Sequence, residues 1–397
     1  MRQRKTKTSA VTAAAVSAVL ALAMSACSSS GGSDGGSSGS TGGSSSGGTS
    51  SGGADNGGLT GAAAKGFAAA QANVQAHIKN PTSIGPTTPI GKTIPTGKTI
   101  DYVNCGAEAC TNAGTALKAA AAVLGWKVKE INAQPTPQSI QAAFDQVVRD
   151  KPDGVASAGF AVASYQRELA SLKAAGIPVF SSTGTDKPGN GLLLQLTSPQ
   201  TPVAMQLVAD KVTVDSKGKG DILNVNLTGY PIVKDYTSEF AAGIRKHCPG
   251  CTLNNLSVNP ASIGKDAPST LANYLRSHPK VKYVFLGYDD VGIGLESAIK
   301  NAGISMPKTY SWAADGPGLA GLATGERTAT VPYDTPVVAW QWADAFARLF
   351  TGGTVAPDTK WEDFVLWSKD YDNLPSNVKT TPVVADYQDQ FKKLWGK

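Results

Sequence analysis

The chain has few histidines and cysteines, and neither sign of charge dominates its body. Its histidines, His77, His247 and His278, are far apart in the sequence, which leaves little material for a metal site or a histidine-dependent catalytic triad. Four of the 36 Lys and Arg residues lie in the first seven positions, and the remaining 32 nearly balance the 30 Asp and Glu. No basic stretch is interleaved with aromatic residues. We therefore expect no metal, no cofactor and no nucleic-acid partner.

Long hydrophobic runs are also missing, apart from residues 9–26, which are mostly Ala and Ser. A positive leader, a short apolar core and small residues before a cleavage site are typical of a secretory signal. A single transmembrane anchor is the alternative, but Ala and Ser insert weakly into membranes. The run ends in Met24-Ser25-Ala26-Cys27, which resembles the lipobox of bacterial lipoproteins. This resemblance implies that Cys27 is acylated and becomes the new N-terminus.

The segment after Cys27 is a Gly/Ser tract that reaches about Gly61. It has almost no apolar side chains, so it cannot bury a core and should act as a flexible tether. We expect a signal peptide over residues 1–26 and a tether over 27–61, which holds the body at the outer face of the cytoplasmic membrane. The rest of the chain has the length of two lobes.

The other four cysteines form two close pairs, Cys105 with Cys110 and Cys248 with Cys251. In an oxidising compartment, two local disulfides are expected. Cys248-Pro249-Gly250-Cys251 also has the spacing of a thiol–disulfide exchange motif. Such motifs open a helix, whereas this one follows a predicted helix, so a structural staple is favoured.

Two periodicities alternate along the chain from Lys98 onwards. Strands are predicted at residues 99–103, 127–131, 154–158 and 177–181, and helices at 112–124, 139–148 and 163–174. The alternation then repeats, with strands at 221–226, 252–257, 283–287 and 309–313, and helices at 203–212, 235–246, 269–276 and 291–302. This pattern predicts an α/β fold of two doubly wound, Rossmann-like lobes with parallel sheets. Ligands of such sheets bind at the carboxyl ends of the strands, which can face each other across a cleft.

The expected domain bounds follow from this series. Residues 62–97 are a collar, with a helix over 63–78 and then a proline-rich extended run. The expected first lobe comprises 98–196 and 334–364, and the second lobe with its tail comprises 197–333 and 365–397. Three strands should cross between the lobes, near 196–198, 331–334 and 364–368. We expect a monomer.

Several phrases in the body resemble the type I periplasmic binding proteins, in particular the ribose- and galactose-binding branch. Lys151-Pro152-Asp153-Gly154-Val155 is similar to that family's approach to its third strand, and residues 174–179, AAGIPV, to its approach to the fourth. Residues 285–294, FLGYDDVGIG, resemble its strand-Asn-Asp-x-x-Ala-x-Gly element, and Ala314-Asp315-Gly316 its Phe-Asp-Gly turn. The resemblance covers about residues 98–370. It implies a two-lobed receptor that closes around a solute and delivers it to a membrane permease.

The resemblance also implies individual binding residues. Asp315 matches the family's ligand-binding Asp, and Tyr288 stands where a binding Asn is usual, followed by Asp289. Tyr333 falls where a hinge-proximal Gln is common, and Lys234 where an Arg often contacts the sugar.

The first lobe departs from the family pattern. Thr183 stands where that lobe normally offers an Asp, and Gly184 replaces the Arg after it. The fold inference survives this departure, but the ribose-like Asp/Arg clamp does not.

A sugar needs planar apolar surfaces and polar groups fixed in the plane of its ring. Residues of both kinds stand at or after predicted strand ends: Asn104, Phe160, Ser182, Tyr230, Tyr288, Asp289, Trp312, Asp315 and Tyr333. This set is richer in aromatic residues and poorer in arginine than a usual pentose or hexose site. An aromatic or purine-like solute therefore stays open.

Structural roles compete with binding at four of these positions and at Lys234. Trp312 can belong to the core, and Phe160 can pack the end of the third strand. Asn104 can form a turn, Asp289 can cap the following helix, and Lys234 can be solvated on its helix.

Three function classes follow from this reading. The leading hypothesis is a lipid-anchored receptor for an ABC importer, with a sugar as its solute. The second is a sensor that presents the same closed lobes to a membrane kinase or chemoreceptor; neighbouring permease and ATPase genes would favour transport. The third is an anchored hydrolase, but no G-x-S-x-G turn is present and no histidine stands where a base is needed. We therefore expect no enzyme.

Overall fold

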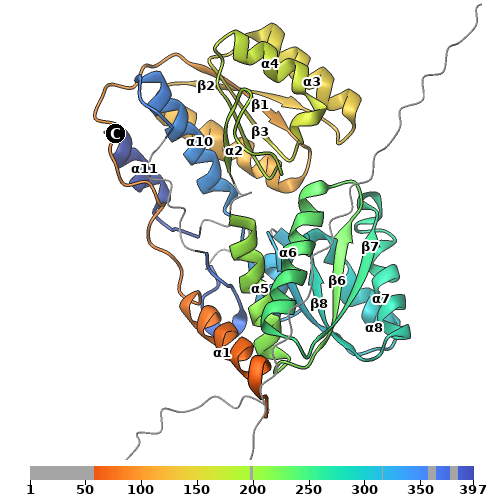
Figure 1. Cartoon of the computed structure of the whole chain (residues 1–397). Coiled ribbons are helices and arrows are strands. Elements are labelled where there is room, and N and C mark those ends of the chain that lie inside the picture. The colour runs from red at the N-terminus through yellow and green to blue at the C-terminus, as the bar shows by residue number, and fades with distance from the viewer. Residues whose placement is uncertain (1–57, 197–199, 315, 356–363, 376–382) are drawn as a thin grey trace, which may run out of the picture. The chain divides into compact units, whose positions relative to one another are not determined.

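The computed structural model describes residues 58–196, 200–314, 316–355, 364–375 and 383–397. The predicted signal peptide, the predicted lipidation site Cys27, most of the predicted tether and Asp315 lie outside these ranges. All described residues belong to one unit of the chain, Gly53–Lys397. Within it, strands and helices alternate from Thr99 onwards, except that β5 follows β4 directly, and the strands form two separate sheets (Figure 1).

The first sheet has the order β2-β1-β3-β4-β5, and all its neighbouring strands are parallel. Its strands are β1 (Thr99–Asn104), β2 (Lys127–Asn132), β3 (Gly154–Ala158), β4 (Val179–Ser182) and β5 (Leu192–Leu196). The helices around it are α2 (Glu108–Leu124), α3 (Pro137–Asp150), α4 (Gln166–Ala174) and α10 (Thr335–Phe350). α2 packs against α10 and α3 against α4, and the two pairs bury different clusters of apolar side chains.

The second sheet has the order β10-β9-β8-β6-β7 and is also parallel throughout. Its strands are β6 (Asp221–Leu227), β7 (Thr252–Val258), β8 (Val281–Leu286), β9 (Lys308–Trp312) and β10 (Ala329–Val331). The helices around it are α5 (Thr201–Asp215), α6 (Pro231–His247), α7 (Ala267–Ser277), α8 (Leu295–Asn301) and α9 (Gly316–Thr324). α5 and α6 pack on each other, as do α7 and α8 (Figure 1). The predicted fold class, two doubly wound parallel-sheet lobes, is confirmed.

The predicted series needs correction at three elements. The edge strands β5 and β10 end at Leu196 and Val331, where the sequence predicted that the strands crossing between the lobes begin. Both are short and lack a clear two-residue period, which is why the pattern missed them. The helix predicted over residues 291–302 is two pieces, the 3₁₀ turn η4 (Asp289–Gly292) and α8. Gly294 separates them because its backbone is left-handed, with a φ of 81°.

An additional helix before the first strand, α1 (Gly61–Ala76), packs against α5 and α6 of the second lobe. The predicted collar helix is therefore present. Asp210 on α5 is fully buried and accepts hydrogen bonds from Asn73 on α1 at 2.7 Å and from Gln206 at 2.7 Å. His247 Nδ1 lies 2.6 Å from the same carboxylate. The close approach of α1 to the end of α6 needs a glycine at position 66. A Cβ there would lie 2.5 Å from the His247 carbonyl oxygen.

The last described helix, α11 (Tyr387–Trp395), packs against α10 of the first lobe. The Trp395 ring stacks on Trp340 with centroids 5.2 Å apart, and its indole N–H donates to Asp344 at 2.9 Å. Between α10 and α11, Trp367 pairs with Thr330 of β10 in the second sheet. The chain therefore contacts the second lobe once more before α11 returns to the first.

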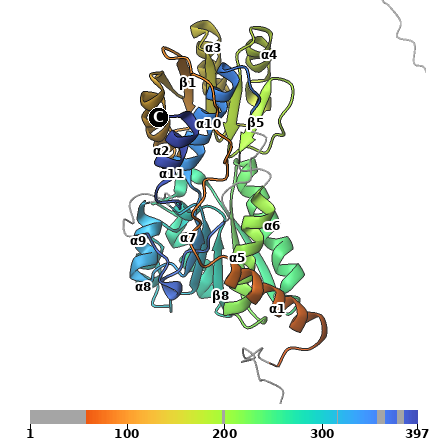
Figure 2. The same cartoon turned by 90° about the vertical axis from the view of Figure 1, so that its left-hand side faces the viewer.

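The segment between α1 and β1 also links the two lobes (Figure 2). It leaves α1 on the second lobe, and its Thr88 carbonyl then accepts a hydrogen bond from Arg348 on α10 at 2.7 Å. Ile90 N–H donates to the Leu394 carbonyl at 2.9 Å. Two further stretches of the chain, residues 77–98 and the described residues 364–375 and 383–395, thus contact both lobes.

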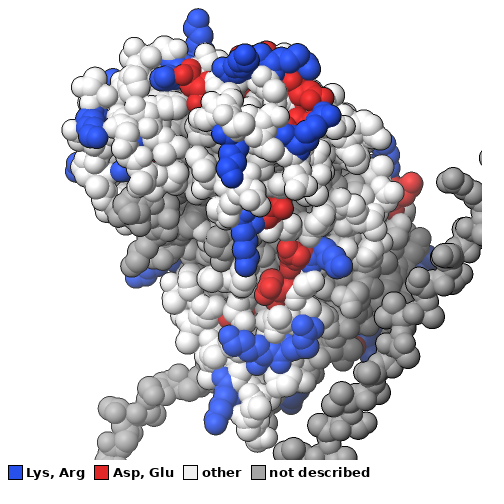
Figure 3. Space-filling model, turned by 45° about the horizontal axis from the view of Figure 1, so that its top comes forward, with Lys and Arg blue, Asp and Glu red and all other residues white. Residues whose placement is uncertain are grey.

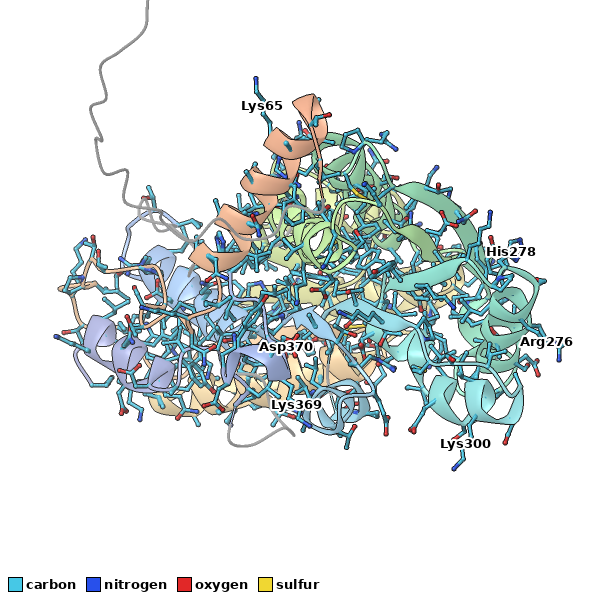
Figure 4. All side chains as sticks on the ribbon, turned by 90° about the horizontal axis from the view of Figure 1, so that it is seen from below. Lys65, Arg276, His278, Lys300, Lys369 and Asp370 are labelled. Atoms are coloured by element: carbon cyan, nitrogen blue, oxygen red, sulfur yellow. A yellow bond between two sulfur atoms is a disulfide. The ribbon has the colours of Figure 1, made fainter. Side chains whose placement is uncertain are left out.

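Charged side chains of both signs cover the outside of the body. On the face in Figure 3, Lys and Arg side chains lie beside Asp and Glu side chains. On the side that Figure 4 shows, the exposed Lys369 and Asp370 belong to the 3₁₀ turn η5 (Lys369–Tyr371). Lys211 of α5 lies 3.5 Å from the Asp370 carboxylate, which ties this turn to the second lobe.

Candidate ligand-binding site between the lobes

A cavity of about 330 Å³ lies at the carboxyl ends of both sheets. Ligand sites of open parallel sheets form at these ends, and small-molecule pockets begin near 300 Å³. The first lobe lines the cavity with Cys105, Ala107, Ala109, Cys110, Gly159 and Thr183. The second lobe and the linker after β10 line it with Leu227, Tyr230, Ile232, Val233, Tyr236, Pro260, Ile263, Tyr288, Asp290, Trp312, Ala313 and Tyr333.

The order of the lining residues follows the strands of both sheets. Cys105, Gly159 and Thr183 come directly after β1, β3 and β4. Trp312 ends β9, and Tyr333 follows β10 by two residues. The parallel topology therefore brings to one cavity residues that are more than 200 positions apart in the sequence.

Aromatic side chains form much of the cavity wall. Trp312 lies between Tyr236 and Tyr333, with ring centroids 5.6 Å and 5.9 Å away. Tyr230 and Tyr288 are half-buried and line the same cavity. Burial raises the pKa of the Tyr230 and Tyr236 hydroxyls, which stay protonated at neutral pH. These rings offer flat apolar surfaces together with hydroxyl donors.

Trp312 has both of the roles that the sequence left open. Only 1% of its surface is exposed, and its ring also contacts Phe364 at a centroid distance of 6.1 Å. It is a core residue that also lines the cavity.

Two neighbouring carboxylates after β8 differ in their surroundings. Asp289 is buried and its Oδ1 lies 3.3 Å from Arg327 Nε, so this carboxylate is ion-paired inside the second lobe. Asp290 lines the cavity. Burial, followed by the negative charges of Asp289 and then Glu108, raises the pKa of Asp290 to about 6, against a hydrogen bond from Tyr288 and the charge of Arg327.

Five residues predicted to bind ligand are not among the lining residues: Asn104, Phe160, Ser182, Lys234 and Asp289. Asn104 accepts a hydrogen bond from Gly106 N–H at 2.8 Å and donates to Glu130 at 2.6 Å, which holds the turn after β1. Phe160 packs edge-on against Phe144, and Lys234 is exposed on α6. Tyr230, Tyr288, Trp312, Tyr333 and Thr183 do line the cavity.

The sequence analysis did not identify Tyr236 and Asp290 as lining residues. Tyr236 lies two turns into α6, on the face that also buries Ile232 and Val233. A helix that starts at the carboxyl end of a strand brings its first turns to the cleft, which is the signal that could have found Tyr236. For Asp289 and Asp290, the sequence alone does not tell which of the two carboxylates lines the cavity.

Both predicted disulfides are present in the structure. Cys105–Cys110 joins the turn after β1 to α2 and lines the cavity. Cys248–Cys251 joins the end of α6 to the start of β7. The second pair therefore follows a helix, where a staple between two elements is expected, rather than opening one.

Two further searches were confined to the described parts of the chain. There, no helix is both long enough and apolar enough to cross a membrane. Among the same residues, no group of three His, Cys, Asp or Glu side chains could hold a metal ion.

The arrangement of two parallel-sheet lobes around an aromatic cavity defines a two-lobed solute-binding fold. Residues 104–354 match the family model described as the periplasmic binding protein domain. The chain therefore belongs to this family, and its fold is the type I form that the sequence motifs resembled. No curated protein matches the chain.

Solved structures with the same fold come from several bacteria. An ABC sugar transporter subunit from Rhodobacter sphaeroides 2.4.1 is 21% identical with a TM-score of 0.61, over 69% of this chain and 99% of that chain. An ABC transporter solute-binding protein from Agrobacterium vitis, bound with alpha-D-tagatopyranose, is 20% identical with a TM-score of 0.61, over 73% and 98%. The 5-methylthioribose transporter solute-binding protein from Thermotoga lettingae TMO is 16% identical with a TM-score of 0.64, over 77% and 99%. At these identities, the likeness shows the fold alone.

Proposed function

We propose that this chain is the solute-binding component of an ABC importer. It captures one small solute between its lobes and delivers the closed form to permease subunits. The observation that carries the proposal is the cavity at the carboxyl ends of both sheets, because residues from both lobes line it. A ligand there contacts both lobes at once, so it favours the arrangement in which they are close.

The anchor belongs to the same proposal. Acylated Cys27 and the Gly/Ser tether would hold the body at the outer face of the cytoplasmic membrane, within reach of its permease. A tether of roughly thirty Gly/Ser-rich residues has an average span of about 30 Å as a random coil. We further propose that the protein is a monomer with the lobe bounds stated above, except that α11 belongs with the first lobe because it packs on α10.

A sugar is the first candidate for the solute, since related folds are described as binding tagatopyranose and 5-methylthioribose. An aromatic or purine-like solute is the second candidate, and the five aromatic rings of the cavity favour it. A sensor role would use the same cavity and the same closure. Loss of solute uptake in cells that lack the chain would favour the importer.

The test is a thermal-shift panel of sugars, nucleosides and aromatic compounds with the purified body, residues 58–397. We expect one solute class to raise the melting temperature, because binding to the folded form alone stabilises it by mass action. Tyr230→Ala should remove this shift, since its ring lines the cavity. Tyr274→Ala is the matched control, because Tyr274 is also half-buried but is not among the cavity-lining residues. Tyr274 stacks instead on His278, the residue after α7, which Figure 4 labels.

Two outcomes would contradict this proposal. The first is a panel in which no solute stabilises the protein. The second is a shift that survives Tyr230→Ala and disappears with Tyr274→Ala, which would place the binding site elsewhere.

A further inference from the structure

The cavity between the lobes has an unusual balance of charge for a sugar site. Asp290 is the charged residue among its described lining residues, and no Lys or Arg is among them. The first lobe contributes Thr183 and small or apolar residues instead of an acid and a base. A solute in this cavity therefore meets one carboxylate and no fixed positive charge on the described wall.

Arg327, whose positive charge acts on Asp290, is already paired. Arg327 and Asp289 form an ion pair at 3.3 Å, and both side chains are buried. The packing around Asp289 holds the pair in place, since a Cβ on Gly318 would lie 1.8 Å from its Oδ2. Arg327 attracts Asp290 only as a neighbouring charge, whereas the Tyr288 hydroxyl is the hydrogen-bond donor of Asp290. A carboxylate in such a setting is stabilised by a cation that enters the cavity.

The aromatic wall suits the same kind of ligand. Tyr230, Tyr288, Trp312 and Tyr333 line the same cavity as Asp290. The faces of tyrosine and tryptophan rings attract a cation within about 6 Å of the ring centre, and more strongly when water is excluded. The Asp290 carboxylate and the aromatic rings thus both favour a ligand with a positive charge.

A second carboxylate reaches towards this region from the first lobe. Glu108 begins α2, and a Cβ on Gly316 of the second lobe would lie 3.0 Å from its Oε1. The negative charge of Glu108 contributes to the raised pKa of Asp290. Glu108 therefore adds a second negative charge close to Asp290, although it is not itself among the lining residues.

We propose that the solute of this protein carries a protonated amine, which is held by Asp290 and the tyrosine rings, next to a ring that packs on Trp312 and Tyr333. This inference rests on the proposed solute-binding function and specifies the chemical class of the solute. It applies to an amino sugar and to an aromatic amine alike, because both place a cation beside a flat apolar face. The two sources are separated by the probes below.

The experiment measures binding by isothermal titration calorimetry to residues 58–397 at neutral pH with two matched pairs. The first pair is D-glucosamine and D-glucose, and the second is tyramine and tyrosol; within each pair only the amine is cationic. We expect the amine of one pair to bind at least tenfold more tightly than its neutral partner, and that pair identifies the ring. Asp290→Asn should abolish the preference, whereas Asp389→Asn, which removes an exposed carboxylate on α11, should leave it unchanged.

The proposal is overturned if neither amine binds, or if the neutral member of each pair binds as tightly as the amine. It is also overturned if Asp290→Asn keeps the preference while circular dichroism shows a folded variant. Binding of glucose or tyrosol without any preference for the amine would leave the solute-binding function intact and remove only this inference. The failure of the inference and the failure of the proposed function therefore give different results.

Discussion

Asp101 is one of the residues whose protonation should be visible in the stability of the protein. It lies on β1 and is fully buried. Burial and then the negative charge of Asp150 raise its pKa to about 7, although Lys129 acts in the opposite direction. Between the ordinary pKa of about 3.9 and this value, the folded protein binds a proton that the unfolded chain releases. The free energy of unfolding therefore falls as the pH rises through this range.

The prediction for Asp101→Asn is a flatter pH dependence of stability. Urea unfolding at several pH values from 4 to 7.5 should show a smaller loss of stability for the variant than for the natural protein. Burial also raises the pKa values of Asp290 and Asp334, to about 6 and about 7. These two groups therefore contribute to the pH dependence of stability in both the natural protein and the Asp101→Asn variant. Asp145→Asn, at an exposed carboxylate paired with Arg167, is the control and should keep the full slope. An unchanged slope in Asp101→Asn would contradict the assignment.

At the scale of single elements, α11 should be an integral part of the first lobe. Its Trp395 stacks on Trp340 and donates to Asp344, which in turn accepts from Arg348 at 2.7 Å. Removal of this indole leaves a cavity and one buried acceptor with fewer partners. We expect Trp395→Ala to lower the free energy of unfolding by about 3 kcal/mol.

Urea denaturation measures this loss, and Lys392→Ala on the same helix is the control. Lys392 is part-exposed and pairs only with Asp389, so its removal should change stability by less than about 0.5 kcal/mol. Equal effects of the two substitutions would show that α11 adds nothing to the core.

At the scale of the whole molecule, several chain segments connect the lobes. Residues 77–98 and the described residues 364–375 and 383–395, called straps here, contact both lobes in addition to the linker before α10. Closure about these connections must bend the straps as well as the linker. Hinge motions of this kind are absorbed by a few positions at the ends of elements.

Small-angle X-ray scattering tests the closure. We expect the radius of gyration of residues 58–397 to fall when the stabilising solute of the thermal-shift panel is added, and to stay constant with a solute that gives no thermal shift. In Tyr230→Ala the solute should leave the radius unchanged. A radius that stays constant with a bound solute would mean that binding and closure are not coupled.

Much of the fold could be predicted because it depends on local periodicity. The burial of Ile140, Ala143, Phe144 and Val147 on one face of α3 follows from their spacing. The strands β5 and β10 could not be found in this way, because they are short and are held by their neighbours in the sheet. Gly294 shows the reverse case, in which one backbone conformation interrupts a pattern that otherwise favours a helix.

In the candidate site, too, some residues could be predicted from their local position in the sequence and others could not. Tyr288, Trp312 and Tyr333 could be placed because they stand at the ends of strands, where parallel sheets bind ligands. Asn104 and Phe160 stand at such ends too, yet their side chains bond or pack within the first lobe. A position at a strand end does not fix the direction of a side chain; its neighbours do.

By itself, the sequence determined the alternation of strands and helices, the two parallel-sheet lobes and the pairing of four cysteines, because each depends on residues that are close together in the chain. Only the tertiary structure decided that Asp289 is paired with Arg327 while Asp290 faces the cavity, and that Tyr236 joins the aromatic wall. It also decided that α1 packs on the second lobe and α11 on the first. These outcomes depend on contacts between residues that are distant in the sequence, and no local pattern records them.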